Sequence, residues 1–252
     1  MTIGLKFGIV CSSYKIPPTF LNNIALELDS LNMSKITLNG SKVSSWRNTV
    51  GSESFIQNTS GRQPTLSHGG ITFTRSLSTD LKSSGFFYFD NVINGAGSKF
   101  TITLSVYLTN VSTAQYIFGQ YGGTSSSRSL AVANNSGILQ INIRSNNSVE
   151  VIQQVTDLTL QINTRYNIIL SCDVTQSTGN ETKVFVDGIE RTLSSTTSDI
   201  VEVNSSASWN IGSAISSFFD GTIFSIFLFN RLYTPQDAID LNDYLNDKYT
   251  YV

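Results

Sequence analysis

The segment Lys99–Leu108 restricts the fold of this chain more than any other feature. From Phe100 onward every second residue is a large apolar side chain, and the residues between them are Thr, Ser or Tyr. Successive side chains of a strand point to opposite faces, so this alternation predicts a β-strand with one buried and one solvated face. A strand of this kind needs neighbours, and the chain is therefore expected to build a sheet.

Short apolar segments with turn residues between them recur along the chain. They are expected to form strands at 71–75, 85–90, 116–121, 129–133, 138–144, 149–155, 166–174, 209–212 and 222–230. Residues 181–193 are predicted to form a hairpin that turns at Asp187-Gly188, because Asp-Gly supplies the positive φ values of a two-residue turn. The run at 222–230 is almost continuously apolar, which predicts a strand covered on both faces. This spacing is typical of a sandwich or a barrel.

One helix is predicted near the C-terminus, over Pro235–Asp247. Thr234 is a favourable N-cap, and Pro235 suits the first helical position. Ala238, Leu241 and Leu245 fall on one stripe, which is expected to be buried.

The first 23 residues are predicted to form an extended arm, because Pro17-Pro18 forces extended backbone. Such an arm packs either on a neighbouring subunit or on its own domain, and the sequence leaves both open. Residues 24–252 are expected to form a single domain. The arm residues expected to contact a partner are Phe7, Ile9, Tyr14, Pro17 and Pro18.

Charge and composition narrow the function. The 252 residues carry a net charge of -2, and charged residues make up 13%. A chain without a basic surface is not expected to bind nucleic acid. The N-terminus lacks the long apolar run of a signal peptide, and no stretch is apolar enough for membrane insertion. Synthesis in a host cytoplasm and release within an assembled virus particle is one route that fits these observations.

Two groups of residues carry a resemblance to a known family. The first joins VFVDG at 184–188, NIG at 210–212 and FDGTIFSIFLFNRLYT at 219–234. It resembles the C-terminal half of laminin G-like, concanavalin A-like domains. The second, weaker group joins Leu28-Asp29, VSSWRN at 43–48, RQPT at 62–65 and GITF at 70–73, and it looks like the start of such domains in phage-encoded and bacterial surface proteins.

The resemblance implies a fold over residues ~24–247. That fold is all-β: a two-sheet antiparallel jelly-roll sandwich of the laminin G-like, concanavalin A-like type, with one short C-terminal helix. It also implies that Trp46 and Trp209 occupy core positions. It does not imply one function, because the fold hosts lectins, glycosidases, adhesion modules and virion proteins.

The sequence carries no complete set of catalytic residues. A glycosidase of this fold needs paired carboxylates, and related glucanases carry them as E-x-D-x-x-E. The nearest string, Glu27–Asn32, lacks the last acid and lies at the start of the domain. The single histidine, His68, stands beside two glycines and is predicted to be a turn residue. No enzyme activity is expected.

The two cysteines and the acids at strand ends are weaker candidates. Cys172 is predicted to be a small core residue, and its pairing with Cys11 stays open. No cofactor is expected. Calcium, which binds several Asp, Asn and carbonyl oxygens, is conceivable at strand ends without assigned ligands. The acids in question are Asp90, Asp173, Asp187 and Asp220.

The segment 120–128 is the best candidate for sugar binding. Tyr121 is expected to offer a stacking platform on a hydroxyl-rich turn, flanked by Gln120 and Arg128. An ordinary hairpin connection is the alternative reading of this loop.

Two functions follow from these observations. The first is a non-catalytic virion structural protein: a capsid decoration, a head fibre or a tail-associated adhesion protein. It would lie on the virion surface and contact a major capsid or tail protein and further copies of itself. The second is a carbohydrate-binding module or lectin for host-surface glycans, which is compatible with the first.

Overall fold

The computed structural model describes residues 21–84, 98–121, 128–144, 150–177, 179–194, 208–214 and 216–250. All strand pairings in these ranges are antiparallel. The first strands are β1 (Ile24–Asp29), β2 (Ile36–Asn39), β3 (Lys42–Arg47), β4 (Ser54–Ile56), β5 (Thr65–Ser67), β6 (Gly70–Phe73) and β7 (Leu81–Ser83). Single 3-10 turns lie at η1 (Met33–Lys35), η2 (Ser60–Arg62) and η3 (Arg75–Leu77).

The longer strands occupy the rest of the chain. The middle strands are β8 (Lys99–Leu108), β9 (Gln115–Tyr121), β10 (Arg128–Asn135), β11 (Ile138–Arg144), β12 (Glu150–Gln154), β13 (Thr164–Asp173), β14 (Thr182–Val186) and β15 (Ile189–Arg191). The last elements are β16 (Asn210–Ile211), β17 (Ser213–Ala214), β18 (Ser217–Phe218), β19 (Gly221–Phe229) and the helix α1 (Pro235–Lys248).

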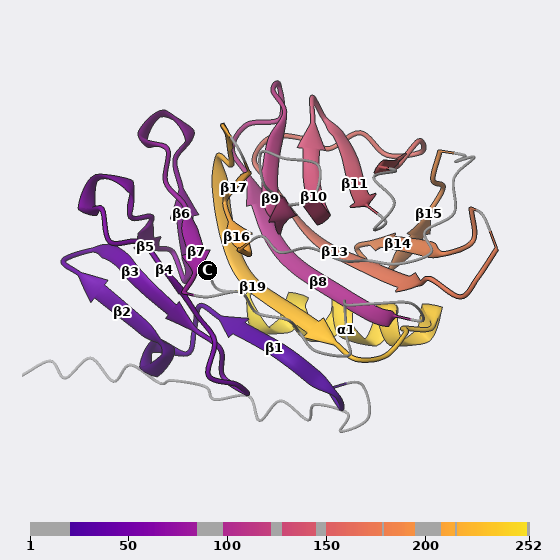
Figure 1. Cartoon of the computed structure of the whole chain (residues 1–252), viewed down its shortest axis with the longest axis horizontal. Coiled ribbons are helices and arrows are strands. Elements are labelled where there is room, and N and C mark those ends of the chain that lie inside the picture. The colour runs from indigo at the N-terminus through magenta and orange to yellow at the C-terminus, as the bar shows by residue number, and fades with distance from the viewer. Residues whose placement is uncertain are drawn as a thin grey trace, which may run out of the picture.

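Six strands form one layer, which we call the helix-side sheet. Its order is β1-β19-β8-β13-β14-β15. The helix α1 lies against its outer face, and Figure 1 shows this helix on the far side of β19 and β8 from β9, β10 and β11. The helix therefore makes a third layer over the sheet.

The second layer, which we call the opposite sheet, runs β12-β11-β10-β9-β16-β7-β4-β3-β2. The hairpin of β5 and β6 joins the two layers, because β5 pairs with β3 while β6 pairs with the start of β19. The sandwich architecture predicted from the sequence is confirmed.

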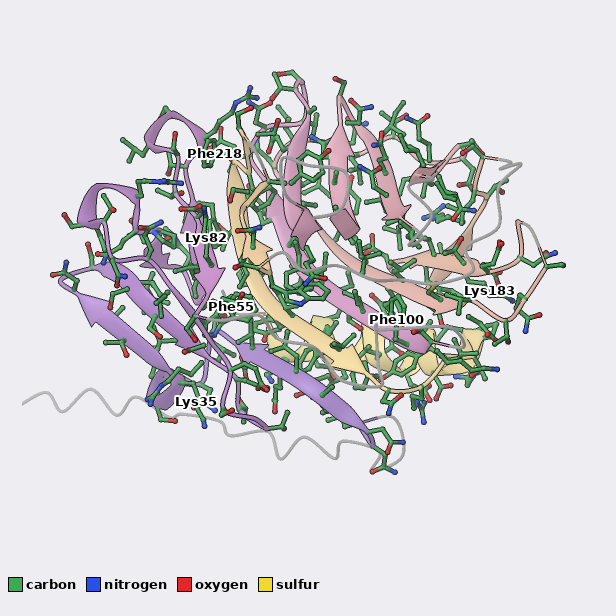
Figure 2. The ribbon with its side chains drawn as sticks, viewed as in Figure 1. Lys35, Phe55, Lys82, Phe100, Lys183 and Phe218 are labelled. Carbon is green, nitrogen blue, oxygen red and sulfur yellow. The ribbon has the colours of Figure 1, made fainter. Side chains whose placement is uncertain are left out.

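Two apolar clusters hold the layers together. The larger lies between the two sheets and includes both tryptophans, Trp46 and Trp209, together with Cys172. Figure 2 shows the side chains that fill this space; Phe55 and Phe100 are fully buried there, while Lys35 and Lys183 lie at the periphery. The core positions predicted for the tryptophans and for Cys172 are confirmed. Burial raises the pKa of the Cys172 thiol far above its usual value, so this thiol is inert.

The smaller cluster lies between the helix-side sheet and α1. Phe227 and Phe229 of β19 meet Leu241 and Leu245 of the helix. The prediction that the strand at 222–230 is covered on both faces is therefore confirmed. The apolar stripe predicted for the helix is also confirmed, since Ala238, Leu241 and Leu245 are all buried.

The expectation that one face of β8 is exposed to solvent is wrong. Its polar residues were expected to face solvent, yet Thr101, Thr103 and Ser105 are completely buried. Thr101 donates a hydrogen bond to the carbonyl of Arg231, at 2.8 Å, in the connection that leads to α1. The helix and its connection cover this face, and small hydroxyl side chains leave room for them. Alternation of polarity identified the strand but not the exposure of its second face.

Turn chemistry agrees with the sequence at two hairpins. Asp187 and Gly188 have φ values of 54° and 77° between β14 and β15. His68 and Gly69 have φ values of 50° and 70° between β5 and β6, which confirms His68 as a turn residue. The strand predicted at 85–90 lies outside the described residues. No helix among the described residues is long and apolar enough to cross a membrane.

The structure gives a role to Asn48, the last residue of the VSSWRN motif. Asn48 follows β3 and lies along the outer edge of β1, where its amide accepts from the Glu27 backbone N–H, at 2.9 Å, and donates to the Ala25 carbonyl, at 3.1 Å. These bonds satisfy backbone groups that an edge strand otherwise leaves open for another chain. Asn48 therefore closes one edge of the helix-side sheet.

Candidate functional site

The outer face of the opposite sheet carries two rows of side chains. Register places Gly119, Ala131, Asn142 and Ile152 side by side across β9, β10, β11 and β12. The second row contains Tyr116, Ala133, Gln140 and Gln154 on the same four strands. On β10, β11 and β12 its members lie two residues from those of the first row. We call this surface the amide face. Its side chains point away from the core, because Val132 and Ile141 between them pack inside the sandwich.

Hydrogen bonds link the amides of this face. The Gln140 Nε2 atom donates to Asn142 Oδ1, at 2.6 Å, and Gln140 Oε1 accepts from Gln154 Nε2, at 3.2 Å. Asn135 Nδ2 also donates to Gln140 Oε1, at 2.9 Å. Asn142 Nδ2 lies 3.5 Å from the hydroxyl of Tyr116. The chain of bonds fixes the orientation of each amide, which matters because an amide presents a donor on one side and an acceptor on the other.

Small residues occupy the middle of the amide face. Ala131 packs against Ala214 of the β17–β18 hairpin and against Tyr116, so this hairpin borders the face. A side chain at Gly119 would meet the Leu130 carbonyl and Ala131, which explains the glycine there. Gln140 and Asn142 are almost buried, while Ile152 is 47% exposed and Gln154 and Tyr116 are partly exposed. The first two therefore act as a floor and the last three as the reachable surface.

The sugar-binding residues expected from the sequence lie next to this face. Gln120 follows Gly119 on β9, but it pairs with Leu130 and is only 5% exposed, which leaves little of it for a ligand. Tyr121 and Arg128 are in register at the ends of β9 and β10. Their side chains lie outside the described part of the structure. The arm residues Phe7, Ile9, Tyr14, Pro17 and Pro18 also lie outside it.

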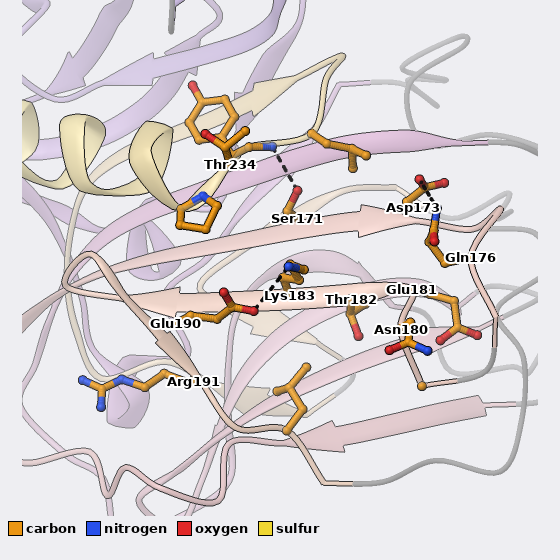
Figure 3. A pocket seen from close by; sticks show the side chains of 15 residues that line it. Ser171, Asp173, Gln176, Asn180, Glu181, Thr182, Lys183, Glu190, Arg191 and Thr234 are labelled. Carbon is orange, nitrogen blue, oxygen red and sulfur yellow. Dashed lines mark hydrogen bonds and ion pairs between the residues drawn. The ribbon is translucent and has the colours of Figure 1, made fainter.

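A cavity of about 740 Å³ lies elsewhere, at the β14–β15 hairpin and the start of α1 (Figure 3). Lys183 and Glu190 face each other across it, with Nζ and Oε1 3.5 Å apart. Ser171 accepts a hydrogen bond from the Tyr233 backbone N–H, at 3.1 Å, and so does not offer its hydroxyl oxygen freely. The described residues that line it carry both signs of charge and expose no aromatic ring, so the cavity specifies a ligand less clearly than the amide face.

The acids at strand ends are dispersed and engaged locally. Asp173 accepts from the Thr175 backbone and hydroxyl, and Asp187 accepts from the Asn167 backbone N–H, at 2.9 Å. Burial raises the pKa of Asp173, but hydrogen bonds from Thr175, Gln176 and Lys99 outweigh it and hold that pKa at about 2. Within the described residues no three His, Cys, Asp or Glu side chains gather as metal ligands. Asp90 lies outside the described residues.

Sequence reasoning missed the amide face. The signal was present as Gln140 and Asn142 two residues apart between buried Leu139, Ile141 and Ile143. That pattern marks an outward face, but only the strand register shows that Gln154 and Tyr116 complete it.

Comparison with known proteins supports the architecture. A family model, Laminin_G_3, described as the concanavalin A-like lectin/glucanases superfamily, matches residues 81–238. No curated protein matches the sequence. The binding domain of Paraclostridial mosquitocidal protein 1 aligns with a TM-score of 0.63 and 10% identity, covering 90% of this chain and 53% of that chain.

Two further solved structures are similar. The binding domain of botulinum neurotoxin serotype G gives a TM-score of 0.56 at 12% identity, over 89% of this chain and 51% of that chain. The CBM40 module of the Ruminococcus gnavus IT-sialidase, bound to α2,3-sialyllactose, gives 0.50 at 12% identity, over 69% of this chain and 95% of that chain. The chain thus spans about half the length of both toxin domains. At these identities the likeness concerns the fold.

Proposed function

The chain belongs to the concanavalin A-like lectin/glucanase superfamily, and from that membership we propose that it is a non-catalytic binding protein that holds glycans on its amide face. The observation that carries the proposal is the hydrogen-bonded series of Tyr116 on β9, Asn142 and Gln140 on β11, and Gln154 on β12. Sugars present hydroxyl groups that both donate and accept, and oriented amides match both roles.

The reachable part of the amide face suits a sugar ring. Ile152 offers exposed apolar surface for the C–H face of a ring, and Tyr116 offers a phenol beside it. Specific sites commonly combine an apolar platform with a few placed polar groups. The likeness of fold to a carbohydrate-binding module bound to sialyllactose supports this reading.

A binding role is favoured over hydrolysis by the chemistry of the face. A glycosidase needs two carboxyl groups about 5–10 Å apart. None of the described side chains in the two rows is an Asp or a Glu. Glu27 and Asp29, the nearest match to a glucanase motif, lie on β1 of the other sheet.

A glycan array with neutral and sialylated oligosaccharides, followed by calorimetry on the strongest hit, tests this function. The Gln154→Ala substitution is expected to weaken binding about tenfold, since it removes a reachable amide worth about 1–1.5 kcal/mol. Gln161→Ala is the matched control, because that exposed glutamine bonds within its own loop, to the Thr159 carbonyl at 3.1 Å. An array without hits, or equal loss in both variants, contradicts the proposal.

We further propose that this binding domain belongs to a virus particle, as a capsid decoration, head fibre or tail-associated adhesion protein. The support comes from the sequence: a predicted N-terminal arm, a net charge of -2 and a polar surface rich in Ser, Thr and Asn. In this role the arm contacts a major capsid protein, a tail protein or another copy, and the amide face meets host-surface glycans. Mass spectrometry of purified particles should detect the chain, and a chain that binds neither itself nor a particle protein contradicts the role.

A further inference from the structure

A compact group of ionisable side chains joins the first strand to the last helix. The Lys248 Nζ atom, at the end of α1, lies 2.7 Å from Oδ2 of Asp29, at the end of β1. The Tyr249 hydroxyl donates to Asp29 Oδ1, at 2.9 Å. Lys248 Nζ also donates to the Tyr244 hydroxyl, at 2.9 Å. Lys248 and Asp29 are far apart in the sequence but adjacent in the fold.

The surroundings of this pair are aromatic and largely dry. The side chains of Lys248 and Asp29 are only 14% and 11% exposed. The rings of Tyr244, Tyr249 and Phe227 have their centres 5.2, 5.8 and 5.9 Å from Lys248 Nζ. In such surroundings a separated ammonium and carboxylate lose most of the stabilisation that water gives them. Burial lowers the pKa of Lys248, but the Asp29 charge and the hydrogen bonds to Asp29 and Tyr244 outweigh it and raise that pKa, so the nitrogen must pass a proton to a neighbouring group before it can attack.

A second carboxyl group accompanies the pair. Glu27 lies two residues before Asp29 on the same face of β1, opposite Phe227 of β19. Burial raises the pKa of Glu27, while the nearby Lys248 charge lowers it and Asp29 raises it. A carboxyl group in this position can carry a proton between the amine and the departing oxygen.

We propose that Lys248 and Asp29 condense to an amide, so that an internal covalent cross-link ties the end of β1 to the end of α1, with Glu27 as the proton carrier. The Lys248 Nζ atom attacks the Asp29 carboxyl carbon and forms the C–N bond. One C–O bond of the carboxyl group breaks. The two protons that the ammonium loses leave with that oxygen as water, and Glu27 relays them in turn. The reaction uses no oxidant, no cofactor and no second molecule.

Proximity supplies the driving force. A nitrogen this close to a carboxylate oxygen lies about 3–3.5 Å from the carboxyl carbon, which is the range of near-attack geometry. Well-oriented groups reach effective molarities of about 10⁵ M or more. An effective molarity of that size offsets the tendency of water to hydrolyse the amide, and the aromatic rings limit the access of water to the new bond.

Other lysine–carboxylate pairs in the described residues lack these features. Lys99 lies 3.1 Å from Asp173 and Lys183 lies 3.5 Å from Glu190, but both lysine side chains are about half exposed. Their ammonium groups stay solvated. They are expected to remain ion pairs and serve as internal controls.

Intact mass spectrometry of the full chain under denaturing conditions tests the proposal. The chain is expected to weigh about 18 Da less than its sequence predicts, and tandem spectra should show one branched peptide joining Asp29 and Lys248. A full-length mass without this loss, after prolonged incubation of the folded protein, overturns the proposal and leaves an ordinary ion pair.

Variants separate the cross-link from other losses of water. Lys248→Arg and Glu27→Gln are expected to show the full mass, and Lys99→Arg, the matched control, keeps the loss. Asp29→Asn is expected to lose about 17 Da, because ammonia then leaves in place of water. Dehydration at Asp187-Gly188 or Asp220-Gly221 would persist in Lys248→Arg, and that result also overturns the proposal. The outcome is independent of glycan binding, which is measured on the other sheet.

Discussion

At the scale of single residues, turn and core positions explain most of the recognisable sequence. Asp187 lies at the turn of the β14–β15 hairpin and accepts a hydrogen bond from the Asn167 backbone N–H. The side-chain oxygen of an asparagine could accept the same hydrogen bond. Burial is the largest influence on this carboxyl group and raises the pKa of Asp187 despite the nearby Arg191 and Arg165 charges. The folded state therefore holds this proton more tightly than the unfolded state.

The Asp187→Asn substitution tests that reading. Because the folded pKa is raised, the wild-type stability is expected to fall as pH increases from the ordinary value of 3.8 through the folded pKa. Asn keeps the turn and the acceptor but carries no charge, so it should stabilise the protein at pH 7 and have little effect below 3.8. Urea unfolding at both pH values measures this. A variant that is less stable at pH 7 contradicts the account.

At the scale of elements, α1 buries the outer face of the helix-side sheet. Thr234 and Asp237 cap each other's backbone at its start, and Arg231 pairs with Asp237. The sequence predicted this helix well because caps and the apolar stripe are local signals. It could not predict that Thr101, Thr103 and Ser105 of β8 lie beneath the helix, since that depends on where the chain returns in space.

Removal of the cap tests how firmly the helix is held. Thr234→Ala loses the acceptor for the Asp237 N–H and is expected to cost about 0.5–2 kcal/mol in unfolding free energy. Gln236→Ala is the control, because Gln236 bonds only to Asp240 among the described contacts and Ala is a good helix former. Thermal unfolding of both variants gives the comparison. Equal stability of the two would show that the cap contributes little.

At the scale of the whole molecule, the strands between residues 24 and 73 complete both sheets. β1 and β6 pair along one edge of β19, and β4 pairs with β7, so strands outside the matched range 81–238 pair with strands inside it. The strand positions in that range were predictable from alternation and turn residues. The amide face was not, because it is assembled by register between four strands.

A truncated chain tests the contribution of these strands. A fragment of residues 81–238 leaves unpaired the edge of β19 that β1 and β6 cover, and it lacks Leu241 and Leu245 from the helix cluster. It is expected not to unfold cooperatively, whereas residues 21–252 should. Thermal unfolding followed by circular dichroism distinguishes them. A cooperative transition for the short fragment contradicts the account.

NMR titration with the strongest glycan from the array shows whether glycans bind on the amide face. We expect the side-chain amide signals of Asn142, Gln140 and Gln154 and the methyl signals of Ile152 to shift with one dissociation constant. The signals of Lys183 and Glu190 at the cavity are expected not to shift. Shifts confined to the cavity, or none on the amide face at saturating glycan, would contradict that expectation.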